Sequence, residues 1–282
     1  MTKHSPQKTF LITGVSSGFG RAFATAALND GHTVIGTVRN ETAQKAFADM
    51  HEKAHAILLD ITQFDAIGPA IDAAQSNIGP IDVLVNNAGY GHEGILEESP
   101  LEELIAQFNA NVFGAVAMIK AILPAMRQRR SGHIINITSM GGFITMPGIS
   151  YYCGSKFALE GISETLASEV APFGIHVTAI APGSFRTDWA GRSMVRTRRS
   201  ITDYDSLFDP IRDARNQKNG HQAGNPAKAA QALLHIIGLP NPPVHLLLGE
   251  DALDLVRTKM ARLDDELSQW EDITRSTAFD IA

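Results

Sequence analysis

Short, continuously apolar runs alternate with amphipathic helical segments along most of this 282-residue chain. The runs lie at 9–13, 32–38, 55–60, 81–85, 133–138, 175–182 and 244–249. Continuous apolar strands are typical of a sheet that is covered on both faces, and parallel strands need crossovers that are usually helices. The pattern therefore predicts an α/β fold, a doubly wound parallel sheet of about seven strands with helices on both faces.

The composition is uniform along the sequence, which favours one domain over 1–282 rather than two small ones. The alternation stops at 184–224, an arginine-rich stretch without clean periodicity that we interpret as a substrate loop or lid. A helical extension is expected at 250–282, where apolar residues recur at spacings of three and four. These apolar residues are Leu253, Val256, Met260, Leu263, Leu267 and Trp270. We expect them to pack on their own domain, with a subunit contact as the alternative.

Charge and composition exclude several classes of protein. A formal charge of −6 and a pI near 5.9 argue against a nucleic-acid binder. The single cysteine, Cys153, precludes an intramolecular disulfide and fits a reducing compartment. Residues 1–9 lack the apolar segment of a signal peptide, and Lys120 and Pro124 interrupt the most apolar stretch. We therefore expect a cytoplasmic protein without a membrane segment. The ten histidines show no metal-ligand spacing, so no metal is expected.

A glycine-rich turn joins the first apolar run to the first helical segment, 21–29, which Gly31 ends. Gly14 permits a tight turn, Gly18 lets the backbone approach a pyrophosphate, and Gly20 allows close packing of helix on strand. The helix N-terminus would add N–H donors for the anion. The residues expected around a dinucleotide phosphate are Thr13, Gly14, Ser16, Ser17, Gly18, Phe19 and Gly20. This arrangement predicts a Rossmann-like dinucleotide site; the alternative is a helix-entry loop with spare glycines.

The second apolar run ends at Val38, where a dinucleotide fold usually has a carboxylate that binds the adenosine ribose. Here Arg39 and Asn40 follow instead. A guanidinium attracts a 2′-phosphate, and the missing carboxylate removes a repulsion. Arg39 therefore favours NADP(H) over NAD(H), unless it is only a solvated surface arginine.

Polar and small residues follow three other apolar runs, at the carboxyl edge where such sheets bind ligands. They are Asp60 and Ile61, then Asn86, Asn87, Ala88 and Gly89, then Pro182 and Gly183. Asp60 has an equal alternative interpretation as the cap of the helix that follows. The next long helix should begin with a capping box, Ser99 as N-cap, Pro100 and Glu102, and run to about Met126. Asn111 lies within it, either as an exposed polar residue or facing the site.

Residues 138–161 hold a serine, a tyrosine and a lysine at chemically useful spacings. Tyr152 and Lys156 are four apart on a helical pattern and share one face. The phenol has an ordinary pKa of about 10, and a neighbouring ammonium would lower it toward the working range. Ser139 could then hydrogen-bond a substrate oxygen on which charge develops. A capped surface helix with a chance tyrosine and lysine is the alternative.

Taken together, residues 8–249 resemble the short-chain dehydrogenase/reductase family. The matching motifs are T-G-x-x-x-G-x-G at Thr13, Gly14, Gly18 and Gly20; the acidic adenine contact at Asp60; N-N-A-G at Asn86 to Gly89; the tetrad Asn111, Ser139, Tyr152 and Lys156; and Pro182, Gly183 and Thr187. The glycine spacing is that of the compact members. Ser17 stands where some NADP-dependent members carry a basic residue, so the NADP(H) preference depends mainly on Arg39.

The resemblance implies reversible hydride transfer between a nicotinamide and a carbonyl or secondary alcohol. It implies that Tyr152 transfers the proton, that Lys156 lowers the tyrosine pKa and binds the nicotinamide ribose, and that Ser139 binds the substrate oxygen. Asn111 would support a water-linked proton path, and Thr187 would contact the nicotinamide amide. A homo-oligomer, dimer or tetramer, is also expected. The alternatives are a non-catalytic NADP(H) sensor on the same fold and a methyltransferase-like nucleotide binder, which has no use for Y-x-x-x-K.

The substrate pocket should be walled by 141–149, 90–94 and the segment that starts at Ser184. Its apolar members are Phe143, Ile144, Met146, Ile149, Phe185, Trp189 and Met194, and the residues expected to contact substrate are Ser139, Phe143, Met146, Tyr152, Phe185 and Trp189. Such walls suit a small, uncharged ketone or alcohol. Arg192, Arg196, Arg198 and Arg199 could instead bind a carboxylate or phosphate, but we expect them to be solvated or paired with acids such as Asp203 and Asp205.

Overall fold

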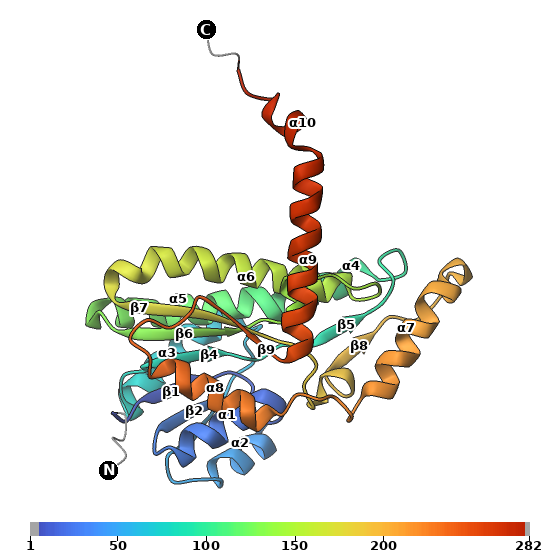
Figure 1. Ribbon diagram of the computed structural model, residues 1–282. Coiled ribbons are helices and arrows are strands. Elements are labelled where there is room, and N and C mark those ends of the chain that lie inside the picture. The colour runs from blue at the N-terminus through green and yellow to red at the C-terminus, as the bar shows by residue number, and fades with distance from the viewer. Residues whose placement is uncertain (1–5, 280–282) are drawn as a thin grey trace.

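In the computed structural model, which describes residues 6–279, seven parallel strands form one sheet in the order β3-β2-β1-β4-β6-β7-β9 (Figure 1). The strands are β1 (Thr9–Ile12), β2 (Thr33–Val38), β3 (Ala54–Leu58), β4 (Val83–Asn86), β6 (Gly132–Ile137), β7 (Ile175–Pro182) and β9 (His245–Leu248). All neighbouring pairs in this sheet are parallel. The expected doubly wound Rossmann-like α/β fold is confirmed.

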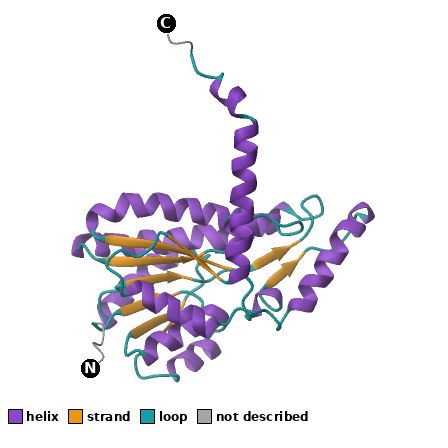
Figure 2. Cartoon of the chain, in the orientation of Figure 1, coloured by secondary structure: helices purple, strands orange, loops and turns teal. Residues whose placement is uncertain are grey.

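Helices cover both faces of the sheet (Figures 1 and 2). One face carries α1 (Gly18–Asn29), α2 (Glu41–Ala48) and α8 (Pro226–Ile237), and the other carries α3 (Phe64–Ile78), α5 (Gly114–Arg129) and α6 (Ser150–Val170). The other α-helices are α4 (Leu101–Phe108), α7 (Asp205–Lys218), α9 (Glu250–Gln269) and α10 (Glu271–Arg275). Gly31 follows α1 with a φ of 85°, in the left-handed region that lets a glycine end a helix.

Two buried apolar clusters lie on opposite faces of the sheet, because successive strand residues point to opposite sides. On β1, Phe10 and Ile12 join the cluster under α1, α2 and α8. Leu11 joins the cluster under α3, α5 and α6. All three side chains are fully buried. The continuous apolar runs of the sequence are thus explained by burial on both faces.

The order of connections reverses between β1 and β4, and their loops therefore diverge at the carboxyl edge of the sheet. β1 pairs with β2 on one side and with β4 on the other. Chain segments leave β1 and β4 for opposite faces, which opens the crevice in which such folds bind ligands. The candidate site lies at this edge.

The helix between β5 (Gly91–Glu93) and β6 differs from the expectation in two respects. It begins at Leu101 after Pro100, and Ser99 does not cap it: the Ser99 hydroxyl donates to the Ile95 carbonyl and bonds the Thr197 hydroxyl instead. The expected capping box is therefore wrong, because the buried serine holds the segment around Thr197. A π-helical turn, Asn109–Phe113, also interrupts the helix at Asn111.

The run Leu101–Arg129 is, by length and composition alone, long and apolar enough to cross a membrane. Core helices of globular domains meet the same criterion, and α5 is one of them: Met118, Ile122 and Met126 are fully buried in the cluster under α3, α5 and α6. Packing against the sheet accounts for this apolar composition.

The arginine-rich segment 184–224 has more structure than its sequence pattern indicates. Strand β8 (Met194–Arg196) pairs in parallel with β5 (Gly91–Glu93), and the 14-residue helix α7 follows. Helix α7 carries one buried apolar side chain, Phe208, so it presents almost no apolar periodicity. Its attachment is largely ionic: Arg212 and Arg215 pair with the buried Glu93.

The C-terminal helices project away from the sheet (Figure 1). Helix α9 contacts β9 and the turn Met140–Gly142 at its first turns, where Ala252 and Val256 are buried. Beyond these turns the helix is exposed on all sides. The expectation that its apolar residues pack on their own domain is therefore wrong for those beyond Val256, because that part of the helix projects past the domain and has no surface of it to pack on.

Burial of His133 predicts an acid-sensitive contribution to stability. Burial lowers the pKa of His133 to about 3, and its Nε2 bonds the Thr178 hydroxyl. As the pH falls below 6.5, His133 becomes protonated in the unfolded chain but stays neutral in the folded chain. The free energy of unfolding therefore decreases between pH 6.5 and 3. We expect the free energy of unfolding to fall by ~2 kcal/mol more between pH 7 and pH 5 in the wild type than in His133→Gln.

Urea unfolding of both proteins at the two pH values measures this difference, and His221→Gln at an exposed position is the control. Equal pH-dependent decreases in the free energy of unfolding of wild type and His133→Gln would contradict the assignment of this effect to His133.

Candidate active site

The glycine-rich turn after β1 is held by the loop after β4. The Thr13 hydroxyl accepts the backbone N–H groups of Asn87 and Ala88, both at 2.9 Å. The Asn87 side-chain amide donates to the carbonyls of Thr13 (2.8 Å) and Gly14 (3.2 Å). The two loops therefore form one rigid unit at the carboxyl edge of the sheet.

The three glycines of this turn are required by its geometry. Gly14 and Gly18 adopt positive φ angles of 73° and 55°. A Cβ on Gly20 would lie 2.2 Å from the Gly14 carbonyl oxygen and 2.5 Å from the Asn87 amide nitrogen. Ser17 precedes α1 in extended conformation, and its hydroxyl makes no capping bond. The turn thus leaves a helix N-terminus and a free hydroxyl available to an anion.

Thr187 lies directly opposite this turn. A Cβ on Gly18 would be 3.7 Å from the Thr187 Cβ, so the segment after β7 closes over the glycine turn. Phe19 and Phe185 reinforce the closure, with ring centroids 5.1 Å apart. The structure therefore brings Thr187 to the same crevice as the glycine motif, at a place suited to one end of a dinucleotide.

Arg39 and Asp60 end the neighbouring strands. Arg39 is exposed at the end of β2, and among the described residues no hydrogen bond or ion pair holds its guanidinium. Asp60 accepts the backbone N–H and the hydroxyl of Thr62, and α3 begins later, at Phe64. The alternative that Asp60 caps that helix is thus not what the structure shows. Ile61 is buried beneath Gly114, at the start of α5.

Asn111 is buried and faces the site, so the alternative of an exposed polar residue is wrong. Its side-chain oxygen accepts the Tyr90 N–H at 3.0 Å, and its amide donates to the Tyr90 carbonyl and the Ser155 hydroxyl, both at 3.1 Å. A Cβ on Gly89 would come within 2.8 Å of the Asn111 oxygen and 3.9 Å of the Lys156 nitrogen. The π-helical turn therefore places Asn111 between the loop after β4 and α6.

Lys156 is buried beneath the tyrosine on α6. Its Nζ donates to the Ile137 carbonyl at 2.8 Å and lies 5.8 Å from the centroid of the Tyr152 ring. Burial lowers the pKa of Lys156 to about 8, against an opposing effect of the Glu160 carboxylate. The lysine is thus poised to lose its charge close to neutral pH.

Tyr152 departs from the expectation that the lysine lowers its pKa. Burial raises the pKa of Tyr152 to about 12, although a hydrogen bond with Ser139 favours the phenolate. The buried indole N–H of Trp189 also lowers the pKa of Tyr152, although it makes no hydrogen bond of normal geometry among the described residues. Desolvation outweighs the neighbouring groups because the phenol and the ammonium are both buried. The protein alone therefore holds Tyr152 as a proton donor.

Part of the expected substrate wall surrounds this tyrosine. Tyr152, Cys153 and Ile149 form a small buried apolar cluster against which Met146 and Trp189 pack. The Trp189 ring lies 5.0 Å from that of Tyr152. Met194 lies nearby, since a Cβ on Gly91 would touch both Met194 and Trp189.

Two expected wall residues pack on rings outside the cluster around Tyr152. Phe185 packs on Phe19 and over Gly224, against the cluster under α1 and α8. Phe143 packs edge-on against His245 of β9. Their contact with substrate stays a prediction.

A buried carboxylate behind the lysine was not expected from the sequence. Glu160, one helical turn after Lys156, bonds His245 Nδ1 at 2.8 Å, and burial raises the pKa of this acid. A Cβ on Gly142 would press on the Glu160 side chain, so the acid also contacts the turn that follows Ser139. The i, i+4 spacing from Lys156 was a sequence signal that could have identified it.

Arg192, Arg196 and Arg199 pair with acids and Arg198 is exposed, which are the two outcomes that we expected for these arginines. Arg192 pairs with Asp188, and Arg199 with Glu98, Asp205 and Asp209. Arg196 pairs with the buried Glu93. Asp205 was correctly anticipated as a partner. Glu93 and Glu98 were not, since they are about a hundred residues away in sequence.

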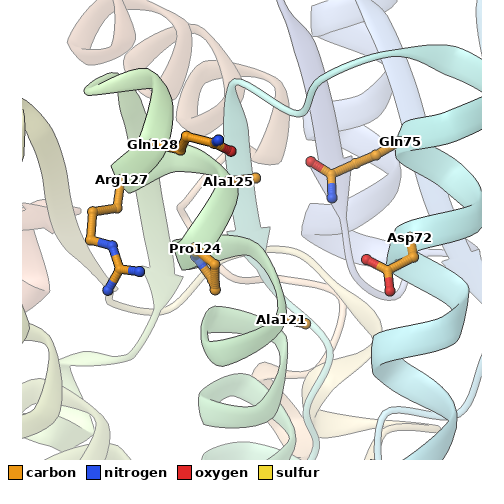
Figure 3. A pocket seen from close by; sticks show the side chains of 7 residues that line it. All are labelled: Asp72, Gln75, Ala121, Pro124, Ala125, Arg127 and Gln128. Atoms are coloured by element: carbon orange, nitrogen blue, oxygen red, sulfur yellow. The ribbon is translucent and has the colours of Figure 1, made fainter.

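A surface hollow between α3 and α5 lies away from these residues (Figure 3). Asp72 and Gln75 of α3 and Arg127 and Gln128 of α5 are among the residues that line it. It contains none of the candidate catalytic residues. Among the described residues there is also no cluster of three or more histidine, cysteine or acidic side chains that could hold a metal ion. The chemistry of the chain is therefore concentrated at the carboxyl edge of the sheet.

The residues at this edge fit a nicotinamide dinucleotide. Gly14 and Gly18 leave space for a phosphate, Ser17 offers a free hydroxyl, and Thr187 lies beyond the turn. Lys156 lies deeper in the same crevice, near Gly89. The donors and the space are thus arranged from the glycine turn toward Tyr152.

Comparison with known proteins supports the same class. The family model described as short chain dehydrogenase matches residues 8–196. Oxidoreductase BOA17 from Botryotinia fuckeliana is 36% identical over 273 residues, covering 96% of this chain and 99% of that protein. A 3-ketodihydrosphingosine reductase from Bacteroides thetaiotaomicron is 37% identical over 262 residues, covering 92% and 94%. The chain belongs to the short-chain dehydrogenase family and is an NAD(P)-dependent oxidoreductase.

Solved structures agree with the fold. A short-chain dehydrogenase from Streptomyces avermitilis has a TM-score of 0.90 and 40% identity, covering 97% of this chain and all of that one. ElxO, solved with NADP bound, has a TM-score of 0.73 and 25% identity, covering 88% and 99%. A short-chain dehydrogenase/reductase from Burkholderia phymatum, solved with NAD, shares the fold at a TM-score of 0.82 and 22% identity, covering 94% and 97%. The last two of these structures were solved with NADP and with NAD, respectively.

Proposed function

We propose that this protein interconverts a carbonyl and a secondary alcohol with NADP(H), using Tyr152 as general acid and base. The observation that carries the proposal is the convergence of Ser139, Tyr152, Lys156 and Asn111 beside the glycine turn. A bound nicotinamide supplies or accepts the hydride. A sensor without turnover has no need for this convergence.

Each side chain then has a distinct task at the substrate oxygen. Tyr152 donates its phenolic proton to the oxygen when the carbonyl is reduced, and accepts it in the reverse direction. Ser139 lies within hydrogen-bonding reach of the phenol and binds the same oxygen. Lys156 binds the nicotinamide ribose, and its ammonium stabilises the phenolate that forms transiently. Asn111, through Tyr90 and Ser155, fixes the loop and helix between which a water-linked proton path runs.

The preference for NADP(H) over NAD(H) rests on Arg39. Its guanidinium is exposed at the end of β2, and no described residue is paired with it. Val38 ends the strand where a carboxylate would repel a 2′-phosphate. An unpaired guanidinium suits that phosphate, whereas Ser17 adds no charge.

The substrate is proposed to be small and largely apolar. Met146, Ile149 and Trp189 supply apolar walls around Tyr152. Arg192, Arg196 and Arg199 of the segment 184–224 are bound to acids, so the excursion acts as a lid held by ion pairs. The relative from Bacteroides is named a 3-ketodihydrosphingosine reductase, which is in keeping with a ketone substrate.

The remaining expectations are also proposals. We propose a cytoplasmic homo-oligomer, dimer or tetramer, that requires no nucleic acid or membrane. An apolar groove on the outer face of α5 and α6, which includes Val116, Leu123, Phe157 and Ile162, offers one surface for a second copy. The single catalytic domain would span 1–282, with the lid at 184–224.

The catalytic assignment predicts a sharp contrast between two adjacent tyrosines. Tyr152→Phe removes only the proton donor, so turnover should fall by at least ~10²-fold while cofactor binding is retained. Lys156→Met should impair both. Tyr151→Phe is the control, because the Tyr151 hydroxyl donates to the Ser99 carbonyl away from the reaction. Steady-state rates with cofactor titrations by fluorescence measure these effects; a Tyr152→Phe rate above roughly a tenth of wild type would disprove the role.

The cofactor assignment predicts that NADPH binds more tightly than NADH and that Arg39→Ala removes most of the difference. A charge-assisted contact is worth ~1.5–3 kcal/mol, which corresponds to roughly tenfold or more in affinity. Lys45→Ala on α2, which removes a nearby exposed charge, should leave the preference unchanged. Titration of both cofactors decides the matter, and a wild-type preference for NADH would refute the assignment.

The substrate assignment predicts a higher kcat/KM for a neutral ketone than for its carboxylated analogue. The walls around Tyr152 are apolar, and the arginines of the lid with described partners are already neutralised by acids. The comparison is made at low and moderate salt. A large, salt-sensitive preference for the acid would mean that the arginine lid, rather than the apolar wall, recognises the substrate.

A further inference from the structure

Helix α9 carries an apolar stripe that its own domain does not cover. Val256, at the base of the helix, is buried, but Leu263, Leu267 and Trp270 along the same stripe are 38%, 61% and 52% exposed. The helix extends away from the sheet, and α10 continues beyond its end (Figure 1). A stripe of this kind on a stable helix usually has a partner, because isolated helices are marginal in water.

The spacing of the stripe is that of a coiled-coil seam. Its residues follow one another at intervals of three, four, three, four and three. They are Leu253, Val256, Met260, Leu263, Leu267 and Trp270. These are alternating a and d positions of a heptad, the pattern by which one helix packs along another with knobs in holes. The stripe therefore fits a second helix of matching length.

The charges that flank the seam change sign along the helix. At the flanking e and g positions Arg257 and Lys259 are basic, whereas Asp264 and Glu266, one heptad further out, are acidic. The half nearer the domain also carries Glu250, Asp251 and Asp254, of which only Glu250 lies at a flanking position. Two copies of this helix attract one another most strongly when they run in opposite directions, because the basic flanking pair of each then lies beside the acidic pair of the other.

We propose that α9 pairs with α9 of a second copy of this chain as a short antiparallel coiled coil. In the register that aligns the seams, Met260 packs on the partner's Leu263. Trp270 reaches the partner's Leu253. At the flanking e and g positions, Arg257 then faces the partner's Asp264, and Lys259 faces the partner's Glu266. Two-fold symmetry repeats each contact, so the surface is self-complementary.

Other occupants agree less well with these observations. A parallel pair would place Lys259 beside the partner's Asp264 but would oppose Glu266 to the partner's Glu271. The antiparallel register opposes two acids only at its ends, Glu250 and the partner's Glu271. An anionic membrane is disfavoured, since residues 250–275 hold eight acidic and four basic side chains. The seam is also too narrow for a helix that lies in a lipid surface.

The inference rests on the proposed homo-oligomer and is independent of the proposed chemistry. A seam of fewer than three heptads is weak alone, so the pairing should depend on concentration unless the groove of α5 and α6 strengthens the assembly. In either case the contact through α9 is separate from any contact through the groove of α5 and α6. Its loss should lower the mass of the assembly without affecting turnover per subunit.

Disulfide trapping tests the orientation. Met260→Cys and Leu263→Cys are purified separately, mixed, allowed to exchange subunits and oxidised mildly. Antiparallel pairing predicts a mixed disulfide between the two variants and little cross-linking of either alone. The native Cys153 is buried, so the parent protein is the blank. Cross-linking of each variant with itself indicates a parallel pair, and the absence of any cross-link overturns the pairing.

Charge reversal tests the register and the partner. Arg257→Glu with Lys259→Glu, and separately Asp264→Lys with Glu266→Lys, should each halve the assembly mass measured by sedimentation at matched concentration. Mixing the two variants should restore it, because every facing pair is again of opposite sign. If mass is unchanged in all samples, the homo-oligomer uses another surface and only this inference fails. Binding of the wild type to neutral or anionic phospholipid vesicles in place of self-association would identify a membrane site instead and overturn the proposal.

Discussion

The parallel pairing of β1 with β4 is the constraint on which the site depends. It brings the ends of two strands, more than seventy residues apart in sequence, to one edge, where Thr13 and Asn87 bind the two loops together. The glycine turn can then approach Asn87 closely only because Gly20 lacks a side chain. With that edge fixed, α6 places Tyr152 and Lys156 beside the same crevice. The cofactor groove and the catalytic residues are thus positioned by one set of strand pairings.

Burial sets the chemical state of the catalytic pair. The same desolvation raises the pKa of Tyr152 to about 12 and lowers that of Lys156 to about 8, which brings both residues toward their neutral forms. The charged forms required during a reaction must therefore be stabilised by groups that arrive with cofactor and substrate, or by Ser139 and Glu160.

The lid and the C-terminal helix show two different ways of attaching polar segments to an apolar core. Helix α7 buries little apart from Phe208 and is held by arginines around the buried Glu93. Because a buried carboxylate is costly without partners, this cluster also fixes the strand pair β5–β8. Helix α9 has the opposite character: its apolar seam leaves the domain without a covering surface. Helix α7 is thus attached within the domain, whereas helix α9 keeps an exposed apolar surface that is available for association.

The sequence by itself determined the fold class, the strand order along the chain and the glycine turn, because short-range periodicity and spacing encode them; spacing and the resemblance to a family motif also indicated the candidate catalytic residues. It indicated correctly that Arg196 and Arg199 would meet acids, but not which ones, since Glu93 and Glu98 arrive through tertiary contact. Only the tertiary structure decided that Ser99 holds Thr197 instead of capping a helix, that Phe143 and Phe185 pack on other rings, and that burial overrides the lysine at Tyr152. Each of these outcomes is a competition between partners distant in sequence, and its result depends on distances and burial that exist only once the chain has folded.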